Sequence, residues 1–159
     1  MTLHRLREHE VGELREFLEQ ADLTRAGVDT PTVRIWIERD RAGRISGTTG
    51  FEMSADGRHA LIRSVAVVAW ARRTGAGSRL AAFALEEAAR EGATRAWLFS
   101  RRSGPFWQSL GFEPADRDDL SAKLGDTHQV RLFVDSGQLE RELAWSRPLV
   151  RPLAELTEG

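Results

Sequence analysis

Apolar and polar residues are distributed along the first half of the chain in patterns that predict two types of element. Residues 33–37 alternate with a period of two, which is typical of a strand with one buried face. Residues 45–53 and 59–67 predict two further antiparallel strands joined by a hairpin turn, and residues 3–6 predict a short first strand. A period near that of the α-helix predicts an amphipathic helix over residues 8–21. The apolar positions of this helix are Val11, Leu14, Phe17, Leu18 and Ala21.

The change from strand to helix within residues 65–91 is the most informative pattern in the chain. A β-branched apolar run is followed by a loop, residues 72–77, that holds two arginines and two glycines. A helix-forming run over residues 78–91 comes next and is closed by Gly92. This order directs backbone N–H groups and the positive end of a helix dipole toward one point, and glycine lets the backbone come close to a ligand. The segment therefore predicts a site for a phosphate-bearing ligand.

The second half of the chain predicts further elements of both types. We expect a strand over residues 94–100, a short helix over 105–109 and a strand beginning at Gly111. Helical character over residues 118–124 and a last strand over 142–149 complete the prediction. The order of elements predicts an α/β (α+β) fold with a mixed sheet that is antiparallel in its first half and contains a central βαβ unit.

Composition narrows the class of protein. The 159 residues carry 23 Lys+Arg and 24 Asp+Glu, a balance that argues against a dedicated nucleic-acid-binding protein. There is no cysteine, so thiolate chemistry and disulfides are excluded, and the four histidines have no metal-ligand spacing. We find no internal repeat, linker, signal-type segment or apolar run of membrane length. A single domain over residues 1–159, in the cytoplasm and without a membrane partner, is the expectation.

Two motifs resemble those of a known family. Arg72-x-x-Gly75-x-Gly77, placed between strand and helix, resembles the acetyl-CoA motif of the GNAT N-acetyltransferases, which reads Arg/Gln-x-x-Gly-x-Gly/Ala. Residues 106–112, with an aromatic pair followed by Gly-Phe, resemble the second marker of that family. The resemblance implies the GNAT fold, a mixed and largely antiparallel central sheet with helices on both faces. It also implies acetyl-CoA as co-substrate and transfer of an acetyl group to a primary amine.

Within the family, three segments resemble the small acetyltransferases of arsenic-resistance type or those similar to N-acetylglutamate synthase. They are residues 62–67, 50–52 and, more loosely, 145–149.

The resemblance also assigns residues to the cofactor. The pyrophosphate would lie on backbone N–H groups of residues 73–78, and the pantetheine arm would pair like an extra strand with Val65 and Val67. The N–H of Val67 would polarise the thioester carbonyl. The residues assigned to acetyl-CoA are Val65, Ala66, Val67, Arg72, Arg73, Thr74, Gly75, Ala76, Gly77, Ser78 and Trp107.

Two charged residues are candidates for the acceptor side. Glu52 is the candidate general base, because the family often places an acid on this strand; the alternative is a solvent-facing glutamate. Arg63 stands where many members carry an acid, and an arginine there suits an acceptor with a carboxylate. The acceptor would then be a small amino-acid-like molecule. The alternative for Arg63 is a structural ion pair with Glu52 or another carboxylate.

The chain also departs from the family at Trp107. The family usually carries tyrosine there, credited with protonating the leaving thiolate, and this chain has no tyrosine. Tryptophan cannot deliver that proton, although Ser103 or a water could relay one. A catalytically weak acyl-CoA-binding sensor is therefore the alternative to an enzyme, and a nucleotide-binding domain is a more remote one. We expect direct attack by the amine without a covalent intermediate, in a monomer or homodimer.

Overall fold

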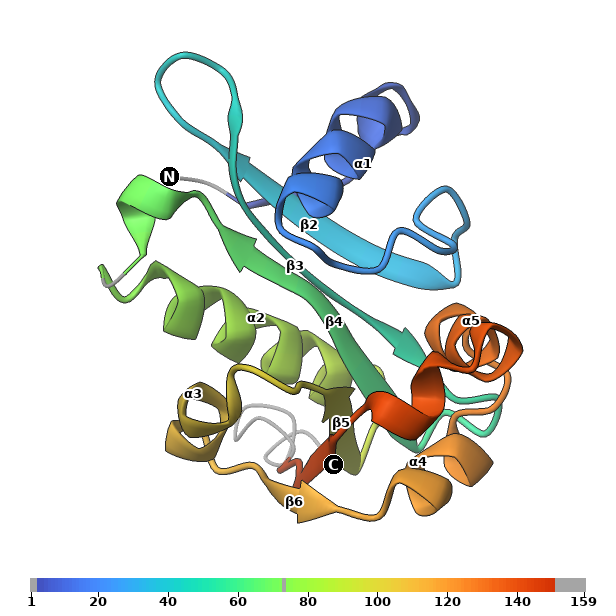
Figure 1. Cartoon of the computed structure of the whole chain (residues 1–159). Helices are drawn as coiled ribbons and strands as arrows, with labels where there is room; N and C mark the ends of the chain where they lie inside the picture. Colours follow the sequence, from blue (N-terminus) through green and yellow to red (C-terminus); the bar gives the residue numbers. More distant parts are fainter. Residues whose placement is uncertain (1–2, 73, 151–159) are drawn as a thin grey trace.

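One mixed sheet of seven strands runs through the molecule (Figure 1). The computed structural model describes residues 3–72 and 74–150. Along the sheet the strands follow the order β1-β2-β3-β4-β5-β7-β6, and only the pair β4 and β5 is parallel. The strands are β1 (His4–Arg5), β2 (Val33–Arg39), β3 (Ile45–Met53), β4 (His59–Val67), β5 (Arg95–Phe99), β6 (Glu113–Ala115) and β7 (Ala144–Pro148).

Helices cover both faces of this sheet. The α-helices are α1 (Val11–Gln20), α2 (Ala76–Arg90), α3 (Gly104–Ser109), α4 (Arg117–Lys123) and α5 (His128–Ser136). Short 3₁₀ turns precede α1 (η1, Glu8–Glu10), follow β4 (η2, Ala69–Ala71) and follow α5 (η3, Gln138–Arg141). Successive side chains of β2 point to opposite faces of the sheet. Ile35 packs with the α1 core on one face, whereas Trp36 packs against Phe83 of α2 on the other. On β4, Ile62 belongs to the α2 core and Leu61 to the core under α4 and α5.

The predicted fold class is confirmed, with two local differences. The helix expected over residues 8–21 begins with the 3₁₀ turn η1 and becomes α-helical at Val11. The helix α5 was not predicted. In the sequence it follows α4, and the two helices are inserted between β6 and β7. These inserted helices cover the α1 face of the sheet where β4 and β5 meet.

β4 departs from regular pairing on both of its sides. Against β3 the register shifts between Thr48 and Gly50, and Ser64 has φ +61°, so β4 carries a bulge there. The Thr48 hydroxyl donates to the Ser64 carbonyl over 2.6 Å and holds the bulge. Against β5, pairing ends at Leu61 with Trp97, and the rest of β4 has no strand on that side in the described chain. The two strands therefore separate toward their carboxyl ends.

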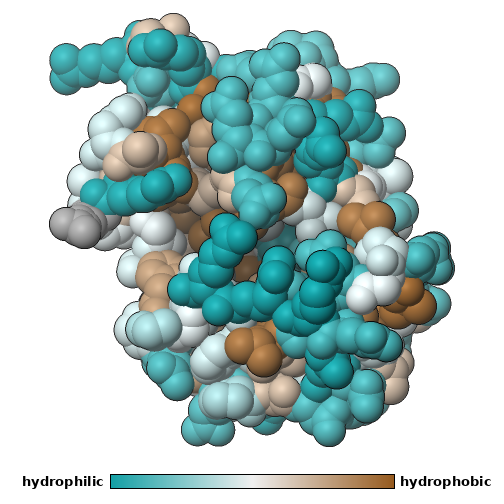
Figure 2. All heavy atoms as spheres, viewed as in Figure 1, coloured by the Kyte–Doolittle hydropathy of each residue, from teal (hydrophilic) through white to brown (hydrophobic). Residues whose placement is uncertain are grey.

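The surface is mostly hydrophilic in this view, and apolar atoms lie recessed among polar side chains near the middle of the face (Figure 2). Among the described residues no helix is both long and apolar enough to cross a membrane.

Candidate active site

The loop before α2 has the geometry expected of an anion site. Gly75 is the N-cap residue of α2 and has φ +86°, a left-handed conformation that costs a residue with a Cβ about 1–2 kcal/mol. The N–H of Arg79 makes the first helical bond, to the Gly75 carbonyl. The N–H groups of Gly77 and Ser78 precede it in the first turn, so they are available to a ligand. Arg72 and Thr74 are exposed beside them, and Arg73 lies outside the described residues.

The unpaired edge of β4 leads to this loop. The N–H of Val68 donates to the Ser46 carbonyl on β3 over 2.9 Å. Because neighbouring residues of a strand point their N–H groups to opposite sides, the N–H of Val67 points away from β3 and toward the gap beside β5. Val65, Ala66 and Val67 are all partly exposed. An extended, amide-rich ligand therefore has a strand edge to pair with.

The two sequence motifs meet in space at Gly77. A Cβ placed on Gly77 would lie 3.7 Å from the ring of Phe106, so α3 packs directly against the first turn of α2. Trp107 points into the core instead. It is 8 % exposed and makes edge contacts with Phe106 and Phe112. Trp107 is thus a packing residue of the core that contains α2, and its predicted contact with the cofactor stays a prediction.

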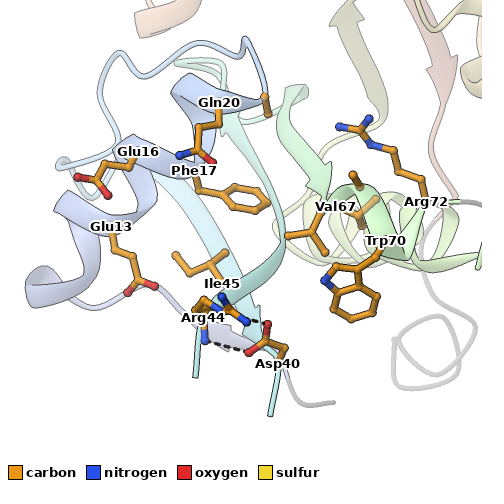
Figure 3. Close-up of a pocket in the computed structure, with 13 residues that line it drawn as sticks. Glu13, Glu16, Phe17, Gln20, Asp40, Arg44, Ile45, Val67, Trp70 and Arg72 are labelled. Carbon is orange, nitrogen blue, oxygen red and sulfur yellow. Dashed lines mark hydrogen bonds and ion pairs between the residues drawn. The ribbon is translucent and has the colours of Figure 1, made fainter. Parts of the chain in front are cut away.

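A pocket of about 570 Å³ opens at the end of β4, between α1, the turn from β2 to β3, and η2 (Figure 3). Val67 and Arg72, two of the residues assigned to the cofactor, line it. Trp70 of η2 also lines it and is 64 % exposed. In Figure 3 the side chain of Arg72 extends toward the end of α1. The sequence pattern did not single out Trp70 as a site residue.

Arg79 lies on the first turn of α2 but is engaged by the protein. Its two terminal nitrogens donate to the two oxygens of Glu38, over 3.0 and 2.7 Å. These hydrogen bonds raise the pKa of Arg79, and Glu38 itself is buried on β2. The bidentate pair fixes the start of α2 against the sheet. The hydroxyl of Thr49 adds a second tie, because it donates to the Leu80 carbonyl over 2.7 Å.

Glu52 and Arg63 form an ion pair inside the protein. Nη1 of Arg63 lies 3.0 Å from Oε2 of Glu52, and the side chains are 1 % and 2 % exposed. Burial lowers the pKa of Arg63, and the charge of Glu52 acts in the opposite direction. The ion pair weighed above as the alternative for Arg63 is therefore the interaction that the structure contains. The roles of Arg63 in acceptor binding and of Glu52 as a base stay predictions.

The remaining contacts of this pair reach two other segments. Arg63 donates to the carbonyls of Thr24 and Ala26, over 2.9 and 2.7 Å, in the loop after α1. Glu52 accepts hydrogen bonds from the N–H groups of His128 and Gln129 at the start of α5, over 2.7 and 3.2 Å. A carboxylate at a helix N-terminus is stabilised by the free N–H groups and the dipole. The pair thus connects the sheet to the loop after α1 and to the inserted helix.

A family model described as the acetyltransferase (GNAT) family matches residues 3–112. No curated protein matches the chain.

Several solved structures of acetyltransferases share the fold of this chain. The N-acetylglutamate synthase of Neisseria gonorrhoeae, complexed with coenzyme A and N-acetyl-glutamate, is 19 % identical with a TM-score of 0.70, over 94 % of this chain and 35 % of that one. The chain thus spans about a third of the length of that synthase. A GNAT acetyltransferase of Staphylococcus aureus is 15 % identical with a TM-score of 0.69, over 94 % of this chain and 99 % of that one.

The Rv2747 protein of Mycobacterium tuberculosis, in complex with CoA, is 14 % identical with a TM-score of 0.68, over 94 % of this chain and all (100 %) of that one. These similarities describe the fold. The family model covers more than half of the sequence. The matched residues include the glycine motif of residues 72–77 and the aromatic motif of residues 106–112, which meet at the start of α2. The chain therefore belongs to the acetyltransferase (GNAT) family.

Proposed function

We propose that the protein is an acetyl-CoA-dependent N-acetyltransferase that acts on a small-molecule primary amine. The observation that carries the proposal is the unpaired edge of β4 leading into the glycine loop at the start of α2. The edge suits an amide-rich arm, and the loop suits a pyrophosphate. The CoA complexes among the structural neighbours are consistent with this co-substrate.

In this arrangement main-chain groups of the protein would make most of the contacts with acetyl-CoA. The N–H groups of Gly77 and Ser78 would hold the pyrophosphate, with Arg72 supplying charge beside them. The N–H of Val67 would stabilise the thioester oxygen as negative charge develops on it, the role of an oxyanion-hole donor. Thr74, Gly75 and Ala76 shape the loop, and Val65 and Ala66 supply the edge.

Acetyl transfer requires that a neutral amine attack the thioester carbon. A C–N bond forms and the C–S bond breaks, so that the products are the N-acetyl compound and coenzyme A, whose thiol takes the proton that the amine loses. A thiol with a pKa of about 8.5 leaves readily as the thiolate, so this mechanism does not require a tyrosine as general acid. Holding the amine next to the thioester would supply a large part of the rate enhancement.

The contacts of Glu52 support a structural contribution more than the role of general base. Both of its oxygens already accept hydrogen bonds, from Arg63 and from α5, and the side chain is 2 % exposed. A base needs to reach the amine directly or through one water. We therefore propose that water carries the proton from the amine.

Gly77→Glu tests the cofactor site. The added Cβ itself meets only ordinary contact at 3.7 Å from Phe106, so the variant should fold. Its carboxylate would lie among the N–H groups that bind the pyrophosphate, and we expect at least a tenfold weaker affinity for acetyl-CoA by calorimetry. Gly77→Gln is the matched control, because it has nearly the same size without the charge. Equal affinity of a folded Gly77→Glu protein and the wild type would overturn the cofactor assignment.

Release of coenzyme A thiol with a panel of amines distinguishes an enzyme from a sensor. The panel contains the standard amino acids, spermidine and an aminoglycoside. Turnover of any amine supports the proposed activity. Tight binding of acetyl-CoA without turnover of any member would favour the acyl-CoA-binding sensor.

A further inference from the structure

A second pocket lies on the far side of the gap between β4 and β5. It has a volume of about 210 Å³ and lies between the loop after α1, the end of β5 and the inserted segment α5–η3. Ala21, the residue that follows α1, borders both this pocket and the larger one that contains Val67. We call the smaller one the β5 pocket.

Charges of both signs line the β5 pocket. Nε of Arg101 lies 2.7 Å from a carboxylate oxygen of Glu142, whose side chain is only 7 % exposed. Arg102 and Asp22 form a second pair, at 3.4 Å, and both are largely exposed. Glu142 is thus buried at the pocket, whereas Arg101, Arg102 and Asp22 are exposed at its rim. A ligand that carries both a carboxylate and an amino group can pair with the arginines through the carboxylate and with the acids through the amino group. No buried charge is then left unpaired.

The same pocket contains a polar group without a partner. Gln129 of α5 is 9 % exposed, and its amide nitrogen donates to the hydroxyl of Thr24 over 2.9 Å. Its amide oxygen has no hydrogen-bond partner within residues 3–72 and 74–150. A buried acceptor without a donor costs about 1–3 kcal/mol, which a ligand N–H would recover.

The walls of the pocket are held in place by the buried Glu52–Arg63 pair. Arg63 binds the carbonyl of Thr24 on one wall, and Glu52 binds the N–H of Gln129 on the other. Thr24 and Gln129 also bind each other directly. The site is therefore built in advance from three segments that are distant in the sequence.

We propose that the β5 pocket binds the acceptor, and that the acceptor is a compact zwitterion of the size of a free α-amino acid. Its carboxylate binds Arg101 and Arg102, and its amino group is held by Glu142 and the amide oxygen of Gln129. This assignment rests on the proposed acetyl transfer and gives its acceptor a chemical class. It also places the recognition of the carboxylate on Arg101 and Arg102 instead of Arg63.

The test compares the twenty standard amino acids with their carboxamides, which lack the negative charge. The readout is kcat/KM for release of coenzyme A thiol at saturating acetyl-CoA. The wild type should prefer at least one free acid over its carboxamide by tenfold or more. Arg102→Gln, at the exposed rim, and Arg101→Gln should each reduce that ratio at least threefold by raising KM for the acid. The KM for acetyl-CoA should not change.

The matched control is Arg90→Gln, at an exposed arginine of α2 whose one ion pair within residues 3–72 and 74–150 is with Glu87. It should leave the ratio of acid to carboxamide unchanged. Gln129→Leu should raise KM for the acid and its carboxamide alike, because both carry the amino group.

Three outcomes would overturn the proposal. They are equal rates with acids and carboxamides, a preference for spermidine over every amino acid, and ratios in Arg101→Gln and Arg102→Gln that equal the wild-type ratio. In each of them acetyl transfer itself persists. Loss of acetyl-CoA binding, or binding without turnover of any amine, would instead contradict the proposed function.

Discussion

At the scale of single residues, Glu52 and Arg63 are the charges whose environment has the largest consequences. Each is almost fully buried, and each binds two backbone groups of another segment besides its partner: Arg63 in the loop after α1 and Glu52 at the start of α5. Removing one charge of such a pair leaves the other uncompensated in a medium of low polarity, whereas removing both does not. A comparison of single and double variants of this pair can therefore separate an effect on folding stability from an effect on catalysis.

Glu52→Gln should lower the free energy of unfolding by about 3–5 kcal/mol, because it leaves the Arg63 guanidinium without a counter-charge. The double variant Glu52→Leu, Arg63→Met should lose clearly less than the sum of the two single losses, as measured by urea unfolding. Strict additivity would show that the two charges do not interact energetically. If Glu52 is also the general base, kcat of the folded Glu52→Gln protein would fall by about 10²–10⁴ in addition to the loss of stability.

His59 makes folding stability depend on pH. Its Nδ1 accepts a hydrogen bond from the indole N–H of Trp97 over 3.0 Å, which requires a neutral ring. Burial lowers the pKa of His59 below the unfolded value of 6.5. As the pH falls, the unfolded state binds the proton first, so the stabilisation is complete above about pH 6.5 and is lost as the pH falls through the folded pKa.

His59→Asn keeps an acceptor for Trp97 but does not titrate. The wild type should therefore lose more stability than His59→Asn between pH 7.5 and 5, as measured by thermal unfolding. His9→Asn, at an exposed position, is the control and should follow the wild type. Parallel pH profiles for wild type and His59→Asn would contradict the assignment.

At the scale of elements, the incomplete pairing of β4 is the feature that connects fold and function. The strand has a full partner on the β3 side, but its other edge is open after Leu61. Backbone groups at an open edge exchange their amide hydrogens faster than those in a ladder. The open edge lies in the interior of the sheet order, where aggregation through it would require another chain to enter the gap.

Hydrogen exchange can detect the pairing of this edge with acetyl-CoA. The amide of Val67 should become protected when acetyl-CoA is added, because it faces the gap. The amide of Val68 already donates to Ser46 and should change little. Equal changes at the two amides would indicate a general stabilisation of the protein instead of strand-like pairing.

The elements also differ in how well the sequence predicts them. Strands β3 and β4 have the predicted boundaries, and turns that contain Gly43 and Gly57 mark the start of β3 and the connection between the two strands. The helix α5 has clear end signals, Thr127 as N-cap and Gly137 with φ +77° as C-cap, but only Val130 and Phe133 on its apolar side are fully buried along with Gln129. The helix has only nine residues, a length at which an isolated helix is marginal, so its packing on the sheet decides whether it forms.

At the scale of the whole molecule, the two halves of the proposed site differ in how far apart their residues lie in the sequence. The proposed cofactor half lies within residues 65–78, so a single motif with its flanking strand and helix predicts it. The β5 pocket is assembled from the loop after α1, the end of β5 and α5–η3. Those segments carry isolated charges with no motif of their own, and only the fold brings them together. For the same reason the sequence left two roles open for Arg63, acceptor binding and an ion pair with Glu52, and the fold shows the ion pair.

The exposed position of Trp70 has a spectroscopic consequence. The chain contains five tryptophans and no tyrosine, so its intrinsic fluorescence arises from indole rings alone. Trp97, Trp107 and Trp145 are at most 9 % exposed, whereas Trp70 is 64 % exposed. Trp36 on β2 is partly buried, so Trp70 is the most exposed of the five indole rings, and it lies beside the loop before α2. The protein thus carries its own optical reporter at the proposed co-substrate site, and no attached dye is needed to follow binding there.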